Sequence, residues 1–254
     1  MNPPAVDPEL AAAPALLARF KLALNLSMAA IVVLALIFFA EGRWFDPVDF
    51  AIRPQLLAGL IGVIGAPLLH GSAEHLFNNA FSLLVLGTLA GTVYPQATRR
   101  ALPLIWGLSG LGTWLIAPAG GVHLGASGVI HGLGFMVFAL GLLRRDRPAI
   151  AAAMIAFFFF GSMLLTVLPQ ELGVSWEYHL SGALAGLLGA VLWRRADPPP
   201  PRRRYSWEDE PEPAPESEVL EPPSPSDVPV LWHRPPPDVD NVLPFAPRDR
   251  NSVN

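Results

Sequence analysis

The sequence predicts an all-α membrane protein, a bundle of six transmembrane helices followed by a disordered C-terminal tail. Of its 254 residues, 52% are hydrophobic and 15% are charged, which is typical of a chain that crosses a membrane several times. Six apolar runs give the count of helices, at residues 22–40, 75–93, 101–117, 127–143, 149–168 and 178–193. A helix needs about 20 residues to cross the hydrocarbon core. The runs at 127–143 and 178–193 are therefore short, and they leave room for a water-filled cavity on one side.

Charge and proline content divide the chain into three segments. Residues 1–20 form a cytoplasmic N-terminal segment without the pattern of a removable signal peptide, and residues 21–196 form the membrane domain. Residues 197–254 hold 16 of the 28 prolines and 12 acidic against 6 basic residues. This tail cannot bury enough apolar surface to fold, so we expect it to be disordered. The acidity of the tail says nothing about a nucleic-acid partner, and we expect none. The aromatic residues of the tail are candidate anchors for an unknown partner: Tyr205, Trp207 and Trp232.

Basic residues alternate between the loops on the two sides of the predicted bundle. One side carries Arg19, Lys21, Arg99, Arg100, Arg144, Arg145, Arg147, Arg194 and Arg195. The loops of the opposite side carry only Arg43 and Arg53. Because loops rich in lysine and arginine stay in the cytoplasm, both termini are predicted to be cytoplasmic, with the domain in the cell (inner) membrane.

Histidine is the ionisable residue that gathers at the apolar runs. None of the nine acidic residues before position 197 lies inside a run, and the chain has no cysteine, which excludes thiolate chemistry. Polar groups within a bilayer are costly and usually face the interior of the bundle. The candidate functional site therefore comprises the histidines at or beside the predicted outer ends of the runs: His70, His75, His123, His131 and His179.

The second run places two polar side chains on one helix face. His75 and Asn79 are four residues apart, and residues at this spacing share a face. Ser72 is a suitable N-cap for a helix that begins just after it. His70 then belongs to the preceding loop and folds over the end of the helix.

The fourth and sixth runs carry a hydroxyl and an imidazole beside small residues. Ser127 begins the fourth run, one residue before Gly128, and His179 precedes Gly182 and Gly186 in the sixth. Small residues at this spacing let membrane helices approach closely. Packing alone would explain the glycines. If the two glycine faces meet, however, Ser127 and His179 come together as a nucleophile and its base require.

Three motifs in this order resemble those of the rhomboid intramembrane serine proteases. They are H-x4-H-x3-N (His70, His75, Asn79), G-x-S-G (Gly125, Ser127, Gly128) and H-x2-G-x3-G (His179, Gly182, Gly186), and they cover residues 70–193. The resemblance implies a rhomboid-like bundle and a serine endopeptidase that cleaves the transmembrane segments of single-pass proteins without cofactor or metal. It implies that Ser127 is the nucleophile and His179 the base. The implied oxyanion hole consists of the His75 and Asn79 side chains and the Ser127 backbone N–H.

The sequence departs from the family pattern at three places. His131 occupies the position of a tyrosine that stacks on the base, and its ring could either stack or compete as a base. We favour His179, because a base on the same helix as Ser127 is poorly aimed at it. The first outer loop lacks the Trp-Arg pair of many relatives, and Gly91 replaces a frequent glutamate.

Two other functions fit parts of the pattern. One is a catalytically inactive rhomboid-like protein that binds membrane helices, although such a protein is expected to lack the serine or the histidine. The other is a metal site or proton relay built on the five histidines, which fits less well because no carboxylate assists. For a protease, substrates would enter sideways from the lipid. The phenylalanines at 157–160 lie beside this path or simply contact lipid.

Overall fold

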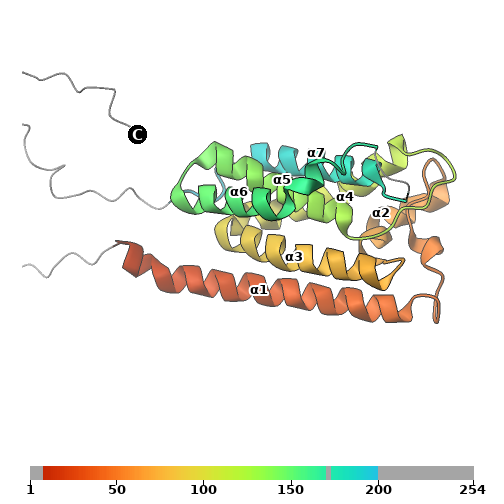
Figure 1. Cartoon of the computed structure of the whole chain (residues 1–254), viewed down its shortest axis with the longest axis horizontal. Coiled ribbons are helices and arrows are strands. Elements are labelled where there is room, and N and C mark those ends of the chain that lie inside the picture. Colours follow the sequence, from red (N-terminus) through yellow and green to blue (C-terminus); the bar gives the residue numbers. More distant parts are fainter. Residues whose placement is uncertain (1–7, 170–172, 200–254) are drawn as a thin grey trace, which may run out of the picture. The chain divides into compact units, whose positions relative to one another are not determined.

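The computed structural model describes residues 8–169 and 173–199, and its secondary structure is helical (Figure 1). Seven α-helices follow one another: α1 (Pro8–Ala40), α2 (Gly62–Gly65), α3 (Ala73–Val93), α4 (Pro95–Ile116), α5 (Ser127–Arg144), α6 (Arg147–Phe160) and α7 (Trp176–Trp193). Four 3₁₀ turns lie between them, at Pro47–Phe50, Leu57–Ile61, Ala66–Leu68 and Gly161–Leu164. The residues so described form no β-strand and only isolated bridges. The all-α prediction is confirmed.

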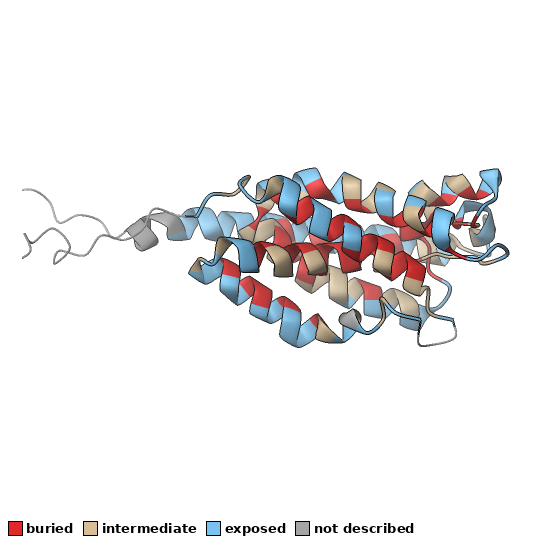
Figure 2. Cartoon of the chain, turned by 90° about the horizontal axis from the view of Figure 1, so that it is seen from above, coloured by how far each residue is buried: buried red, intermediate tan, exposed pale blue. Residues whose placement is uncertain are grey.

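Five of the six apolar runs lie in a helix to within one residue. Three helices are long and apolar enough to cross a membrane, namely α1 from Ala13 onward, α3 and α5. The apolar window of α5 is 61% buried, against 17% in α1 and 22% in α3, because α5 packs against α3, α4, α6 and α7. Figure 2 shows the buried residues concentrated on the inner helices. The structure thus supports a membrane protein built around α5, and the count of six spans stays a prediction.

The prediction for the fifth run is wrong over its last third. A span was expected over residues 149–168, but α6 ends at Phe160 and a 3₁₀ turn follows. Gly161 and Ser162 are poor helix formers, and Pro169 disfavours helical geometry in the residue before it. As a result α6 has 14 residues and is the shortest of the helices that carry the apolar runs, while α5 and α7, with 18 residues each, are shorter than α1, α3 and α4, as predicted. At the other end of the chain, α1 begins at Pro8 and continues without a break past residue 20.

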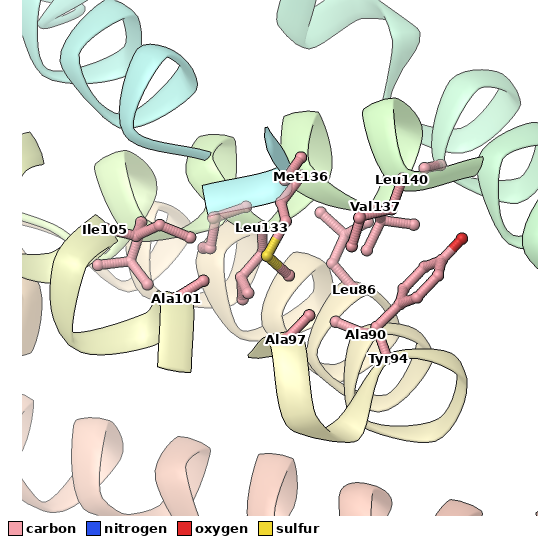
Figure 3. Close-up of a cluster of buried hydrophobic side chains, with 14 of the residues drawn as sticks. Leu86, Ala90, Tyr94, Ala97, Ala101, Ile105, Leu133, Met136, Val137 and Leu140 are labelled. Carbon is pink, nitrogen blue, oxygen red and sulfur yellow. The ribbon is translucent and has the colours of Figure 1, made fainter. Parts of the chain in front are cut away.

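The main apolar core surrounds α5, with residues from α3, α4, α6 and α7, and Figure 3 shows its part between α3, α4 and α5. The core positions on α4 are occupied largely by alanine, while α5 contributes larger side chains. Since small residues leave room for large ones across an interface, α5 is enclosed closely by its neighbours. The buried residues labelled in Figure 3 are Leu86, Ala90, Tyr94, Ala97, Ala101, Ile105, Leu133, Met136, Val137 and Leu140.

Side-chain caps fix the first turns of α3 and α4. The Ser72 hydroxyl accepts a hydrogen bond from the backbone N–H of His75 at 3.1 Å, which confirms the predicted N-cap. The Asp197 carboxylate accepts hydrogen bonds from the N–H groups of Gln96 and Ala97, at 3.0 and 2.8 Å. Asp197 therefore ties the chain just after α7 to the start of α4.

The helices α5 and α7 are in backbone contact through their glycines. A Cβ atom added to Gly182 would lie 1.9 Å from the carbonyl oxygen of Gly128, and one added to Gly186 would lie 2.0 Å from that of Gly132. No side chain fits such gaps, so only glycine permits this approach. The predicted meeting of the glycine faces is confirmed. The contact places His179, one turn before Gly182, beside the beginning of α5.

We expect Gly186→Ala to destabilise the protein, because the added methyl group would overlap the carbonyl oxygen of Gly132. Overpacking of this kind costs about 1–3 kcal/mol. Gly107→Ala is the matched control, since a Cβ atom at Gly107 of α4 would have no heavy atom within 4 Å. The measurement is the midpoint of unfolding by heat or denaturant in detergent micelles. Equal midpoints for the two variants would contradict the packing argument.

Candidate active site

Ser127 is the first residue of α5, as the sequence predicts. Its neighbour Ala126 is the N-cap, and no side chain caps this helix end. The first N–H groups of a helix lack partners within the helix, and the helix dipole favours negative charge there. The half-buried Ser127 hydroxyl is therefore attached to a backbone that can stabilise an anion.

His131 and His179 stack on each other between α5 and α7. Their ring centroids are 3.8 Å apart and the ring planes differ by 12°. Both residues are buried, with exposed fractions of 4% and 8%. His131 thus occupies the stacking position that the sequence analysis considered for it, and its Nδ1 faces the carbonyl oxygen of Ser127, at 2.7 Å.

Thr166 holds both rings. Its carbonyl oxygen lies 3.1 Å from Nδ1 of His179, and its hydroxyl lies 2.9 Å from Nε2 of His131. The hydroxyl also lies 3.0 Å from the carbonyl oxygen of Met163, so its single proton is shared between two acceptors. One residue of the α6–α7 connection therefore orients two imidazoles.

These contacts determine where the ring protons are. A carbonyl oxygen can only accept, so Nδ1 of His131 and Nδ1 of His179 both carry a proton. In a neutral ring the other nitrogen then has a free lone pair. For His131 this lone pair meets the Thr166 hydroxyl, whereas for His179 it is left on Nε2. The hydrogen-bond pattern therefore assigns to His179 the tautomer that a general base needs.

His75 and Asn79 project from α3 toward the loop that ends at Ser127. Gly125 has φ +115°, and a Cβ atom added there would lie 2.5 Å from the His75 ring and 3.3 Å from Nδ2 of Asn79. Glycine is required both by this dihedral angle and by the close approach. Nδ2 of Asn79 is buried and has no hydrogen-bond partner among the described residues, so it remains available as a donor.

His70 lies in the loop before α3 and covers the end of that helix. It is 1% exposed, and its ring meets the His75 ring edge-on at 5.2 Å. Burial and the neighbouring His75 lower the pKa of His70 to about 4, so the ring is neutral at neutral pH. The backbone N–H of His70 donates to the Glu41 carboxylate at 2.9 Å. This contact anchors the loop to the residue that follows α1.

Thr166 and Glu41 are the contacts that sequence reasoning missed. Thr166 lay inside the run at 149–168, where a polar side chain within an apolar run was a usable signal. Nothing in the sequence links Glu41 to His70, because the partner of Glu41 is a backbone amide. Within the described ranges, no group of three or more histidine or acidic residues is arranged to hold a metal ion.

Every predicted site residue lies around the start of α5 or on the α5–α7 contact. His131 and His179 meet as a stacked pair, His70 and His75 meet edge-on, and Asn79 reaches Gly125. The remaining residues form or adjoin the backbone contact: Ser127, Gly128, Gly182 and Gly186.

Comparison with known proteins identifies the family. The sequence model of the rhomboid domain matches residues 58–196, more than half of the chain. An uncharacterized protein of Mycobacterium tuberculosis is 43% identical over 149 residues, 56% of this chain and 62% of that protein. One of Mycobacterium leprae is 36% identical over 141 residues, 52% and 56% of the two chains. A protein of Acanthamoeba polyphaga mimivirus whose name assigns it to the rhomboids is 27% identical over 169 residues, 64% of this chain and 87% of that one.

The match covers less than two thirds of the length of the two mycobacterial proteins. The match to the family model includes the helices that carry the motifs, because α3, α4, α5, α6 and α7 all fall within residues 58–196. The family model matches most of the predicted membrane domain, and the three motifs lie on α3, α5 and α7 or just before them. The chain belongs to the rhomboid family.

Proposed function

We propose that the protein is an intramembrane serine endopeptidase that cleaves transmembrane segments of single-pass membrane proteins. The observation that carries the proposal is the backbone contact between α5, which begins at Ser127 without a side-chain cap, and α7, which carries His179 with its Nδ1 facing the Thr166 carbonyl oxygen. Rhomboid family membership supports the same class of activity. Ser127 would be the nucleophile and His179 the general base of a two-residue dyad.

The proposed reaction begins with attack of the Ser127 Oγ on the scissile carbonyl carbon. The hydroxyl proton passes to Nε2 of His179, and the carbonyl oxygen becomes an oxyanion. The imidazolium then returns this proton to the leaving amine as the peptide bond breaks, and an acyl-enzyme remains. A water molecule, deprotonated by the same Nε2, hydrolyses the ester and restores Ser127.

Three donors would stabilise the oxyanion. The Ser127 backbone N–H belongs to the first turn of α5, and the side chains of His75 and Asn79 approach Gly125 from α3. One preorganised donor of this kind contributes about 3 kcal/mol to lowering the barrier. Nδ2 of Asn79, which has no hydrogen-bond partner among the described residues, supports this role, because a buried donor without an acceptor costs free energy that an oxyanion would recover.

Substrates are proposed to enter from the lipid beside α6. Phe158 and Phe159 are 73% and 67% exposed, as expected for residues that face lipid. Phe157 and Phe160, by contrast, line an apolar hollow between α5 and α6, together with Gly134, Phe135, Phe138, Ala156, Gly161 and Met163. This hollow could receive an apolar side chain of a membrane helix on its way to Ser127.

The membrane arrangement is part of the proposal. Six spans, cytoplasmic termini and a place in the cell (inner) membrane follow from the apolar runs and the alternation of basic loops. The proposed segments of the chain are the cytoplasmic N-terminal segment 1–20, the membrane domain 21–196 and the cytoplasmic tail 197–254, and α1 runs without a break across the first of these boundaries. The predictions of a disordered tail and of an unknown partner for it stay proposals, because residues 200–254 lie outside the described part of the chain.

The dyad is tested by replacing its two members. Ser127→Ala and His179→Ala should each lower cleavage of a model transmembrane substrate in liposomes by roughly 10³-fold or more. Ser82→Ala is the control, since that hydroxyl bonds to a carbonyl oxygen of its own helix. A fluorophosphonate probe should label wild type and not Ser127→Ala. Equal cleavage by wild type and Ser127→Ala would refute the protease, and absence of cleavage by wild type would favour an inactive rhomboid-like helix-binding protein.

The oxyanion hole is tested by a pair of neighbouring asparagines. Asn79→Ala should lower kcat about 10²-fold with little change in KM, because the amide contacts only the developing oxyanion. Asn78→Ala should leave both constants unchanged, since Asn78 is exposed at the preceding position of α3. Similar losses in the two variants would show that α3 acts through its fold alone.

The role of His131 is tested by restoring the family residue. His131→Tyr should keep or raise the rate of cleavage, because a phenol ring can also stack on His179. His131→Ala should lower kcat, since it removes the stacking partner and the link to Thr166. If His131→Tyr abolishes cleavage while His179→Ala does not, His131 is the base.

A further inference from the structure

His123 lies in the loop between α4 and α5, four residues before Ser127. Its backbone pairs with that of Ile52 in an isolated antiparallel bridge. The N–H of Ile52 donates to the His123 carbonyl at 2.9 Å, and the His123 N–H donates to the Ile52 carbonyl at 3.0 Å. Ile52 is fully buried, so the bridge fixes the main chain of His123 firmly.

The side chain of His123 contacts the residue at the start of α7. Its Nδ1 lies 2.5 Å from the hydroxyl oxygen of Ser175, the N-cap of α7. The carbonyl oxygen of Ser175 in turn accepts the backbone N–H groups of Tyr178 and His179, each at 3.2 Å. A chain of hydrogen bonds therefore runs from the loop before Ser127 to the amide of His179.

The two segments each carry a serine and a histidine four residues apart, in opposite order. His123 precedes Ser127 by four residues, and Ser175 precedes His179 by four. The contact between His123 and Ser175 is not built like a catalytic pair. Nε2 of His123 is buried without a hydrogen-bond partner in the described part of the chain, and the hydroxyl of Ser175 is engaged by Nδ1.

The contact is a neutral hydrogen bond. Burial lowers the pKa of His123, and the carboxylate of Glu177 opposes this shift in part. The ring is therefore uncharged at neutral pH. A ring that served only to fill space would not need a nitrogen, since a buried nitrogen without a partner costs free energy. The hydrogen bond to Ser175 offsets this cost at Nδ1, while Nε2 has no hydrogen-bond partner among the described residues.

We propose that His123 is a positioning residue that, through Ser175, sets His179 relative to Ser127. This proposal rests on the proposed function, because it assigns His123 a part in aligning the dyad. Small errors in the relative position of catalytic groups cost up to about 10²-fold in rate. The side-chain link adds to the glycine contact, which sets the distance between α5 and α7 but does not by itself fix the first turn of α7.

The kinetic test compares three substitutions in the full-length protein. His123→Phe and Ser175→Ala should each lower kcat about tenfold with KM unchanged, and the double variant should lose no more than either single one. His123→Asn, whose side chain can reach Ser175 in place of Nδ1, should keep most of the activity. Val122→Ala is the control, because Val122 is 47% exposed on the same loop. Multiplicative losses in the double variant, or losses that follow a lower unfolding midpoint, would overturn the proposal.

A second measurement does not need catalysis. The chain has no cysteine, so Ser127→Cys and His179→Cys together introduce the only two thiols, and their rate of oxidative cross-linking reports how these positions are held. Adding His123→Phe or Ser175→Ala should slow cross-linking several-fold, and Val122→Ala should not. If wild type fails to cleave substrates but cross-linking responds in this way, the proposed function fails and the positioning role stands. An unchanged cross-linking rate overturns the positioning role.

Discussion

The helices α5 and α7 are in backbone contact at Gly128–Gly182 and Gly132–Gly186, and the geometry of the site depends on this contact. It holds the helix that begins at Ser127 against the helix that carries His179. In lipid the hydrophobic effect does not hold helices together, and close packing of small residues takes its place. The stacked rings of His131 and His179 lie in the same interface. The glycine contact and the stacked histidine rings therefore share the interface between α5 and α7.

The site orients its histidines with neutral groups. Each Nδ1 proton is held by a backbone carbonyl, of Ser127 for His131 and of Thr166 for His179. A buried carboxylate would orient a ring equally well, but an ion within a membrane domain is costly unless it is paired. A backbone carbonyl oxygen orients the imidazole ring without placing a charge in the membrane domain. This accounts for the absence of acidic residues from the apolar runs, and it makes the orientation of His131 and His179 depend on the conformation of the connection between α6 and α7.

Sequence reasoning predicted the parts of the site that rest on local spacing. The shared face of His75 and Asn79, the Ser72 cap, the helix start at Ser127 and the glycine faces all follow from residues within one or two turns of each other. It could not predict Thr166 or the link between His123 and Ser175, since these contacts join residues far apart in sequence through loops without periodicity. The end of α6 was missed because hydrophobicity continues past Phe160 while helical geometry does not. The hydropathy of a segment predicts whether it lies in an apolar environment, but it does not predict where a helix in that segment ends.

The glycine contact also has a mechanical consequence. Two backbones that touch have no side chains between them whose rotation could make a gap, so separating α5 from α7 would require rigid-body displacement of a whole helix that also packs on α4. The interface between α5 and α6 contains Phe138, Phe157 and Met163, and rotamer changes of a few such side chains can widen it at lower cost. Movements of the bundle should therefore be largest at α6, while α4, α5 and α7 keep their positions relative to one another.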